Sequence, residues 1–117
     1  MLFLEYSKCS TCKRAKNFLD SNGLSYIDRS VKEKNPTVKE LTNWVNDYDI
    51  PIKKLFNTSG LKYRELNLKN TLNSMSDEEK IKILSSDGML VKRPLLIAND
   101  KILIGFKEQE WKDYFKK

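Results

Sequence analysis

The sequence contains no histidine and only two cysteines among its 117 residues, and this shortage excludes a complete zinc site within the chain. Structural zinc sites need four ligands, normally drawn from cysteine and histidine. Two cysteines supply half of that number, so zinc would require an intermolecular site. Metal chemistry is therefore a poor explanation for the cysteine pair.

The sequence also lacks any apolar run close to the ~18 residues that span a bilayer, and it shows no basic segment followed by a signal-peptide core. We expect a cytoplasmic protein with no membrane partner. Its formal charge is +6, which favours anionic partners in general. The lysines and arginines are scattered and no known nucleic-acid motif occurs, so direct DNA binding is not expected.

The two cysteines, Cys9 and Cys12, lie between an apolar run and a segment with helical periodicity. The run Leu2-Phe3-Leu4 predicts a strand, and the segment after it repeats apolar or small residues at helical spacing at Cys12, Ala15, Phe18 and Leu19. Cys9 would then lie at the start of a helix, where free backbone N–H groups, the helix dipole and the nearby Lys8 favour a thiolate. Cys12, one turn further on and more shielded, is predicted to be the resolving sulfur.

Two other interpretations of the cysteine pair remain beside the redox one. A structural disulfide is the first, but a bridge that closes so short a loop constrains the unfolded chain little. Two incidental cysteines are the second. In the cytoplasm a close pair is more often catalytic or redox-sensing than structural, and the strand, turn and helix around this pair favour that use.

The rest of the chain predicts a second strand, a long helical section, a hairpin and a final helix. Residues 24–31 alternate loosely and should form a strand parallel to the first, joined by a right-handed crossover. Residues 36–91 carry helical stripes and two capping boxes, at Thr37 and Ser76. One of the apolar stripes is predicted to contain Val38, Leu41, Trp44, Val45 and Tyr48. Two apolar runs, 95–98 and 102–104, predict a hairpin, and 107–115 predicts a helix. We expect one domain over 1–117: an α/β, thioredoxin-like (glutaredoxin-like) fold with a four-stranded mixed sheet and an all-helical insertion at 36–91.

Several groups of residues occur in an order and spacing that resemble the arsenate reductase (ArsC)/Spx family, which includes MgsR. They are Cys9–Cys12, Phe56–Gly60 with Tyr63–Leu66, Lys92–Leu95 and Ile104–Lys107. The resemblance implies a thioredoxin-like fold with a helical insertion. In the arsenate reductases of the family, a cysteine at the position of Cys9 attacks the oxyanion and arginines hold it. Arg93 matches one of these arginines, whereas Lys107 stands near the place of another.

The predicted site therefore has Cys9, Cys12 and Arg93 as catalytic residues. Pro94 is expected to form a cis peptide bond that leaves the backbone of Arg93 free to meet a substrate. The residues predicted to contact the substrate are Lys8, Ser10, Thr11, Pro94 and Lys107. No bound cofactor or metal is predicted.

Two functions from different classes fit these residues. The first is an arsenate reductase-like thiol-disulfide oxidoreductase, whose cysteines are reduced by a low-molecular-weight thiol or by a donor protein of the thioredoxin or glutaredoxin type. The second, implied by the resemblance to Spx, is a redox-sensing transcriptional regulator that binds the RNA polymerase α-subunit. In either case we expect a monomer.

Overall fold

The computed structural model describes residues 1–116, which form four strands, six α-helices and three 3-10 helices. The strands are β1 (Leu2–Glu5), β2 (Ile27–Ser30), β3 (Leu95–Ile97) and β4 (Ile102–Ile104). The helices are α1 (Ser10–Ser21), α2 (Val38–Tyr48), η1 (Ile52–Leu55), α3 (Leu61–Glu65), α4 (Leu68–Thr71), η2 (Leu72–Ser74), α5 (Asp77–Ser86), η3 (Gly88–Leu90) and α6 (Glu108–Phe115). Two compact units contain them: the first joins Met1–Ser30 to the chain from Arg93 onward, and the second is Val31–Lys92.

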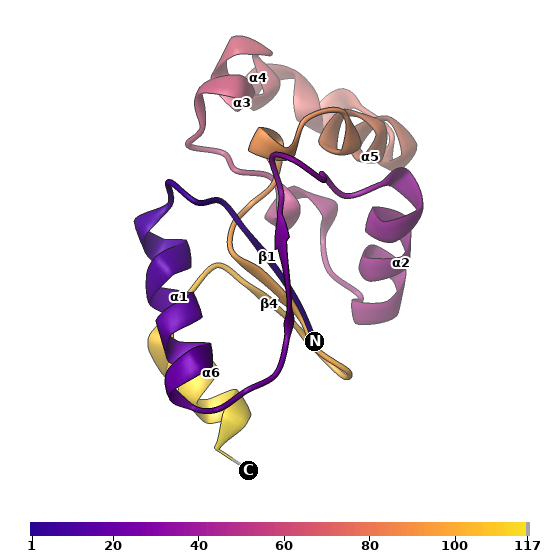
Figure 1. Ribbon diagram of the computed structural model, residues 1–117. Helices are drawn as coiled ribbons and strands as arrows, with labels where there is room; N and C mark the ends of the chain where they lie inside the picture. The colour runs from indigo at the N-terminus through magenta and orange to yellow at the C-terminus, as the bar shows by residue number, and fades with distance from the viewer. Residues whose placement is uncertain (117) are drawn as a thin grey trace. The chain divides into compact units, whose positions relative to one another are not determined.

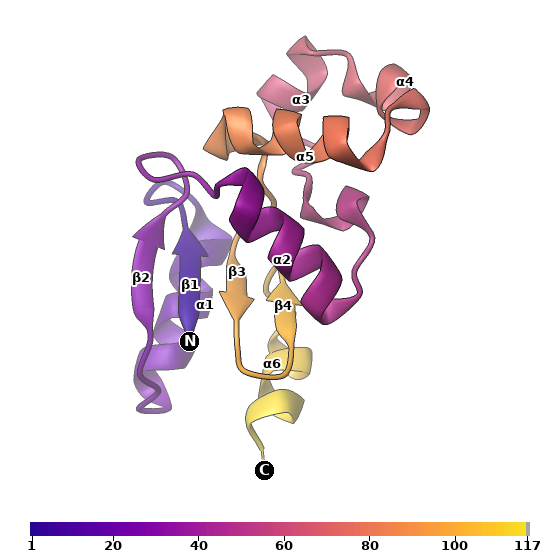
Figure 2. The same ribbon diagram turned by 90° about the vertical axis from the view of Figure 1, so that its right-hand side faces the viewer.

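The first unit contains a mixed sheet with the strand order β2-β1-β3-β4 (Figure 2). Strands β1 and β2 are parallel, with Leu2 opposite Ile27, and β3 is antiparallel to both β1 and β4. The connection through α1 accounts for the parallel pair, because a hairpin cannot join parallel strands. The predicted thioredoxin-like fold with a four-stranded mixed sheet is confirmed.

Helices α1 and α6 cover the same face of this sheet (Figure 1). Side chains alternate between the faces of a strand, so the strand residues that face these helices are two apart or lie opposite one another. The resulting core contains Phe3, Leu96 and Leu103 from the strands, Ala15 and Leu19 from α1, and Trp111 from α6. Trp111 is fully buried, and its Nε1–H donates a hydrogen bond to the carbonyl of Gly105 at 3.1 Å.

The second unit is helical, and its two longest helices begin with the predicted capping boxes. The Thr37 hydroxyl accepts from the backbone N–H of Glu40 while the Glu40 carboxylate accepts from the backbone N–H of Thr37, and Ser76 and Glu79 repeat the arrangement. Helix α2 packs against α5, and the buried residues of its predicted apolar stripe are Leu41 and Trp44. Val38, which was predicted to belong to this stripe, is 44% exposed, because it lies in the first turn of α2.

The backbone of this second unit approaches itself closely at Gly88. A Cβ atom at this position would lie 1.6 Å from the carbonyl oxygen of Val31, so only glycine fits. All helices of the unit lie between residues 38 and 90, inside the predicted 36–91 segment. A single domain over 1–117 stays a prediction. Within residues 1–116, no helix is both long and apolar enough to cross a membrane.

Candidate functional site

Cys9 is the N-cap residue of α1. Its backbone is extended (φ −100°, ψ 114°), and its Sγ accepts a hydrogen bond from the backbone N–H of Cys12 at 3.2 Å. The N–H of Cys9 itself donates to the carbonyl of Tyr6 at 3.0 Å, which closes the turn between β1 and α1. A sulfur therefore takes the place that an oxygen of serine or aspartate usually takes at a helix start. The partly exposed Cys9 side chain lies where the backbone of α1 favours negative charge.

Cys12 lies in the first turn of α1 and is fully buried. Burial raises the pKa of its thiol to about 12, and a hydrogen bond with the Cys9 side chain acts in the same direction. A backbone hydrogen bond from Tyr6 and the charge of Arg93 favour the thiolate and oppose this rise. Both cysteines are free thiols. The two sulfurs are therefore unequal: one is accessible at the helix end, and the other is a shielded thiol in contact with it.

Arg93 reaches this site through the register of the sheet. Leu95 of β3 lies opposite Leu4 of β1, so two steps further along the antiparallel pair Arg93 comes beside Tyr6. The guanidinium carbon of Arg93 lies 5.1 Å from the centre of the Tyr6 ring, a cation–π distance. Its Nη1 is buried and has no hydrogen-bond partner within residues 1–116. A buried donor without a partner costs about 1–3 kcal/mol or more when charged, so this nitrogen is suited to bind an anionic group.

The remaining predicted residues occupy different positions around the turn. Ser10 and Thr11 are the first residues of α1. Pro94 is buried and follows a cis peptide bond, as predicted. Lys8 is exposed in the turn, and Lys107 is exposed at the N-cap of α6. Throughout the described chain, no hydrogen bond joins either lysine to the cysteines, so their contacts with a substrate stay predictions.

The structure adds a charged cluster that sequence reasoning missed. Lys16 Nζ lies 3.3 Å from Glu5 Oε2 and 2.6 Å from Asp28 Oδ2, which connects α1, β1 and β2. Burial raises the pKa of Glu5 to about 7, and a hydrogen bond with Asp28 contributes. Desolvation acts to raise the pKa of Asp28 as well, but hydrogen bonds with Glu5 and Lys16 outweigh it and lower this pKa. The alternation along β1 could have indicated that Glu5 is partly buried, because Glu5 and the buried Phe3 lie on the same face of the strand.

This arrangement can carry out nucleophilic chemistry on sulfur or on an anion. It supplies an accessible thiol at a helix start, a second thiol within reach, and a guanidinium nitrogen with free donor capacity. Across residues 1–116, no cluster of three or more His, Cys, Asp or Glu side chains could hold a metal ion.

Known proteins similar to this chain include both reductase-like and regulatory ones. A family model described as ArsC family matches residues 4–114. The uncharacterized protein YusI of Bacillus subtilis (strain 168) is 42% identical over 113 residues, which cover 97% of this chain and 96% of YusI. Regulatory protein MgsR of the same strain is 26% identical over 110 residues, covering 94% of this chain and 86% of MgsR. A crystal structure described as a possible arsenate reductase from Streptococcus mutans UA159 has a TM-score of 0.86 and 42% identity, covering 95% of this chain and 96% of that one.

Proposed function

Because this chain belongs to the ArsC family, we propose that it is a thiol-disulfide oxidoreductase of the arsenate reductase-like type. The observation that carries the proposal is the position of Cys9 Sγ at the N-cap of α1, where it accepts the backbone N–H of Cys12 at 3.2 Å. Such positions stabilise a thiolate, and the thiolate is the attacking form of cysteine. The relatives' names support a reductase-like family without naming a substrate for this chain.

In the proposed reaction, the Cys9 thiolate attacks one sulfur of a substrate disulfide. The S–S bond of the substrate breaks, one thiolate leaves, and Cys9 is joined to the other sulfur as a mixed disulfide. The Cys12 sulfur then attacks Cys9 Sγ, its proton passes to the departing thiolate, and a Cys9–Cys12 disulfide remains. The substrate has gained two electrons and the protein has lost two. A low-molecular-weight thiol or a thioredoxin-type donor returns them.

Arg93 is proposed to hold the anionic part of the partner beside Cys9. Its buried Nη1 has a free donor, and its packing against the Tyr6 ring fixes the guanidinium at the end of β1. Charge-assisted hydrogen bonds from a guanidinium to an oxyanion are strong and directional. The same nitrogen would serve a carboxylate on a disulfide substrate or a tetrahedral oxyanion such as arsenate.

The test of this function compares two single-cysteine variants with the wild-type protein. Reduction of a glutathione mixed disulfide is followed under turnover with excess glutathione. We expect Cys9→Ser to fall to the rate of the buffer alone, since it removes the nucleophile. We expect Cys12→Ser to accumulate a mixed disulfide on Cys9, visible by mass spectrometry of the intact protein. Applied to a cell extract, the same variant would trap and identify the natural partner.

Lys39→Gln on α2 is the matched control, because it changes an exposed residue outside the site. It should retain the wild-type rate. Retention of turnover by Cys9→Ser, or failure of Cys12→Ser to form any mixed disulfide, would contradict the proposal. Circular dichroism of each variant verifies that the fold is unchanged.

A redox-sensing regulator is the second candidate function, favoured by the similarity to regulatory protein MgsR over 94% of this chain. In that case the Cys9–Cys12 pair would be a switch, and the RNA polymerase α-subunit would be the partner that the resemblance to Spx implies. Co-purification of the α-subunit with the oxidised protein would favour the regulator. Its absence together with turnover that depends on Cys9 would favour the oxidoreductase.

A further inference from the structure

The helical unit Val31–Lys92 contains a cavity of about 670 Å³ that is separate from the cysteine site. It is formed by η1, the turn after it, α3 and the start of α4. A volume of this size is within the range that proteins use to bind small molecules. The residues that line it are Lys53, Thr58, Tyr63, Arg64, Asn67, Lys69 and Asn70.

The charges around this cavity have one sign. Lys53, Arg64 and Lys69 come from three different elements, and no acidic residue lines the cavity. Within the described part of the chain none of these three cations has an ion-pair partner, whereas Lys62 on the same helix as Arg64 lies 4.0 Å from Asp87. Three unneutralised positive charges around one hollow raise the local concentration of anions.

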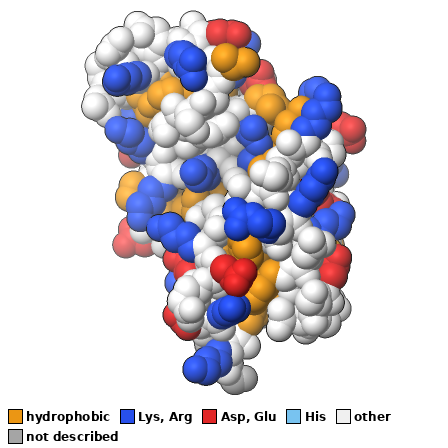
Figure 3. Space-filling view, turned by 90° about the vertical axis from the view of Figure 1, so that its left-hand side faces the viewer, with side chains coloured by type: hydrophobic (Ala, Val, Ile, Leu, Met, Phe, Trp, Pro, Cys, Tyr) orange, Lys and Arg blue, Asp and Glu red, His pale blue; other side chains and the backbone are white. Residues whose placement is uncertain are grey.

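Figure 3 shows the same concentration of charge on the surface. At the top of this face, Lys and Arg side chains gather around uncharged and hydrophobic atoms, and acidic side chains lie to one side of them. The acidic residues of the helical unit include Asp77, Glu78 and Glu79, which lie in the first turn of α5 and do not line the cavity. The lining of the cavity is therefore purely basic and neutral, although Glu65 lies next to Arg64 in the chain.

The walls of the cavity also supply neutral hydrogen-bonding groups on a fixed backbone. Tyr63 is 6% exposed, and its ring packs edge-on against Phe56 with 6.1 Å between the ring centres. The Asn70 amide donates a hydrogen bond to Asn67 Oδ1 at 2.8 Å, which orders the turn into α4. The Thr58 hydroxyl adds a further donor at the rim. Several donors and three cations can thus face one ligand.

We propose that this cavity binds a small anion that carries two or more phosphate groups. A guanidinium fork and two ammonium groups together match several phosphoryl oxygens better than a single monovalent anion. The volume exceeds the needs of one phosphate, and the neutral donors complete the coordination of its oxygens. The site belongs to the helical unit alone and is independent of the function proposed for the cysteines.

The test is a titration of the full ¹⁵N-labelled protein with inorganic pyrophosphate, followed by NMR. We expect saturable shifts of the backbone amides at positions 58, 64, 69 and 70. Arg64→Gln and Lys69→Gln should each weaken binding by about twofold to fivefold, the effect of one exposed charge. Orthophosphate should bind more weakly than pyrophosphate. The alkylation rate of Cys9 should not change in any of these variants.

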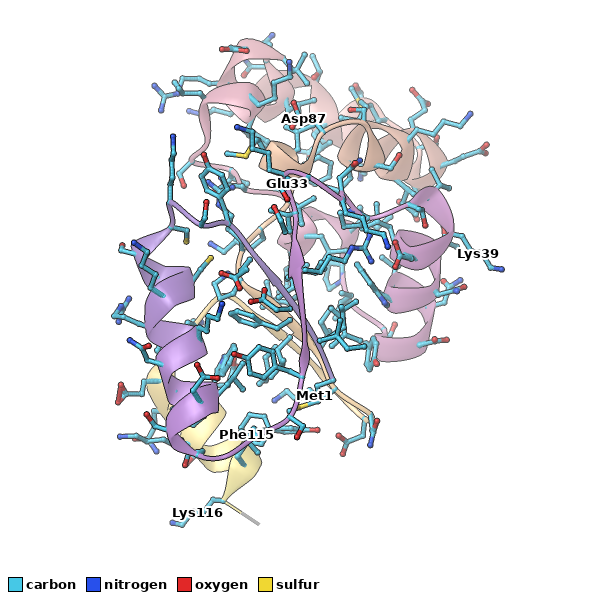
Figure 4. The ribbon with its side chains drawn as sticks, viewed as in Figure 1. Met1, Glu33, Lys39, Asp87, Phe115 and Lys116 are labelled. Atoms are coloured by element: carbon cyan, nitrogen blue, oxygen red, sulfur yellow. The ribbon has the colours of Figure 1, made fainter. Side chains whose placement is uncertain are left out.

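Lys39→Gln is again the matched control, because it removes one positive charge from the same unit without touching the cavity. Figure 4 shows Lys39 pointing away from α2 toward the outside. Equal weakening by Lys39→Gln would overturn the proposal in favour of general charge attraction. Absence of saturable shifts at millimolar pyrophosphate would overturn it as well. If Arg64→Gln fails to fold, Lys53→Gln, an exposed residue of η1, provides the same test.

Discussion

The inequality of the two thiols predicts a large difference in their alkylation rates. In Cys9→Ser only the buried Cys12 remains, and in Cys12→Ser only the partly exposed Cys9 remains. The second substitution leaves the backbone N–H at position 12 in place, so the hydrogen bond to Cys9 Sγ is retained. We expect iodoacetamide to label the Cys12→Ser variant rapidly and the Cys9→Ser variant very slowly at neutral pH.

The size of the effect follows from the thiolate fraction of Cys12. In the wild-type protein, burial and the hydrogen bond with Cys9 raise its pKa from an ordinary value of 9.0 to about 12, which lowers the thiolate fraction at pH 7 by about a thousandfold, since one pKa unit is a factor of ten. Cys9→Ser removes the contribution of Cys9 but keeps burial, the largest cause, so about a thousandfold is the upper limit for this variant. Only the thiolate reacts, so the rate should fall by up to the same factor relative to an unfolded cysteine. Complete burial of the sulfur lowers the rate further. The rate should also keep rising with pH beyond the point at which a free cysteine has reached its plateau.

The assay is a time course of alkylation by mass spectrometry, for each variant between pH 6 and pH 10. Labelling in strong denaturant is the control, because both variants should then react at the same rate. Reaction of Cys9→Ser as fast as the unfolded control would refute the burial of Cys12. A Cys12→Ser variant slower than Cys9→Ser would refute the assignment of Cys9 as the attacking sulfur.

Three further predictions concern the stability of the fold. Because the pKa of Glu5 is raised to about 7, the folded state keeps a proton that the unfolded state releases above pH 4.5. The free energy of unfolding should therefore fall as the pH rises from 4.5 through about 7. Glu5→Gln should flatten this pH dependence in urea titrations. In the same assay, Gly88→Ala should lower the free energy of unfolding by at least about 3 kcal/mol, because the added Cβ would collide with the Val31 carbonyl. A smaller loss would contradict the close approach of these two backbone segments. Thr37→Ala should cost about 1 kcal/mol of unfolding free energy by removing the bond to Glu40, and no loss would argue against the capping box.

The regular elements and the cysteine end of the site were predictable from sequence because their signals are local. The capping boxes at Thr37 and Ser76 each lie within four residues, and both are formed. The position of Cys9 at a helix start follows from an apolar strand and a helical stripe on either side of it. The exposure of Val38 was not predictable in the same way, because a helical stripe gives the face but not where the packing partner ends.

The cluster of Lys16, Glu5 and Asp28 could not be found from local patterns. Its three members come from α1, β1 and β2, and their contact depends on how far the helix is shifted along the strands. A lysine on a helix and an aspartate on an edge strand are each ordinary surface residues when taken alone. Only the folded chain brings Lys16 and Asp28 together with the Glu5 carboxylate, where burial and the hydrogen bond with Asp28 raise the pKa of Glu5.

The contact between Arg93 and the turn depends on the register of β1 and β3. These strands pair with Leu4 opposite Leu95, which brings the position of Arg93 beside Tyr6. A shift by one residue would turn the side chains of β3 to the opposite face and remove Leu96 from the core that it shares with Phe3. The burial that stabilises the sheet therefore also fixes the cation beside Tyr6, where its charge acts on Cys12.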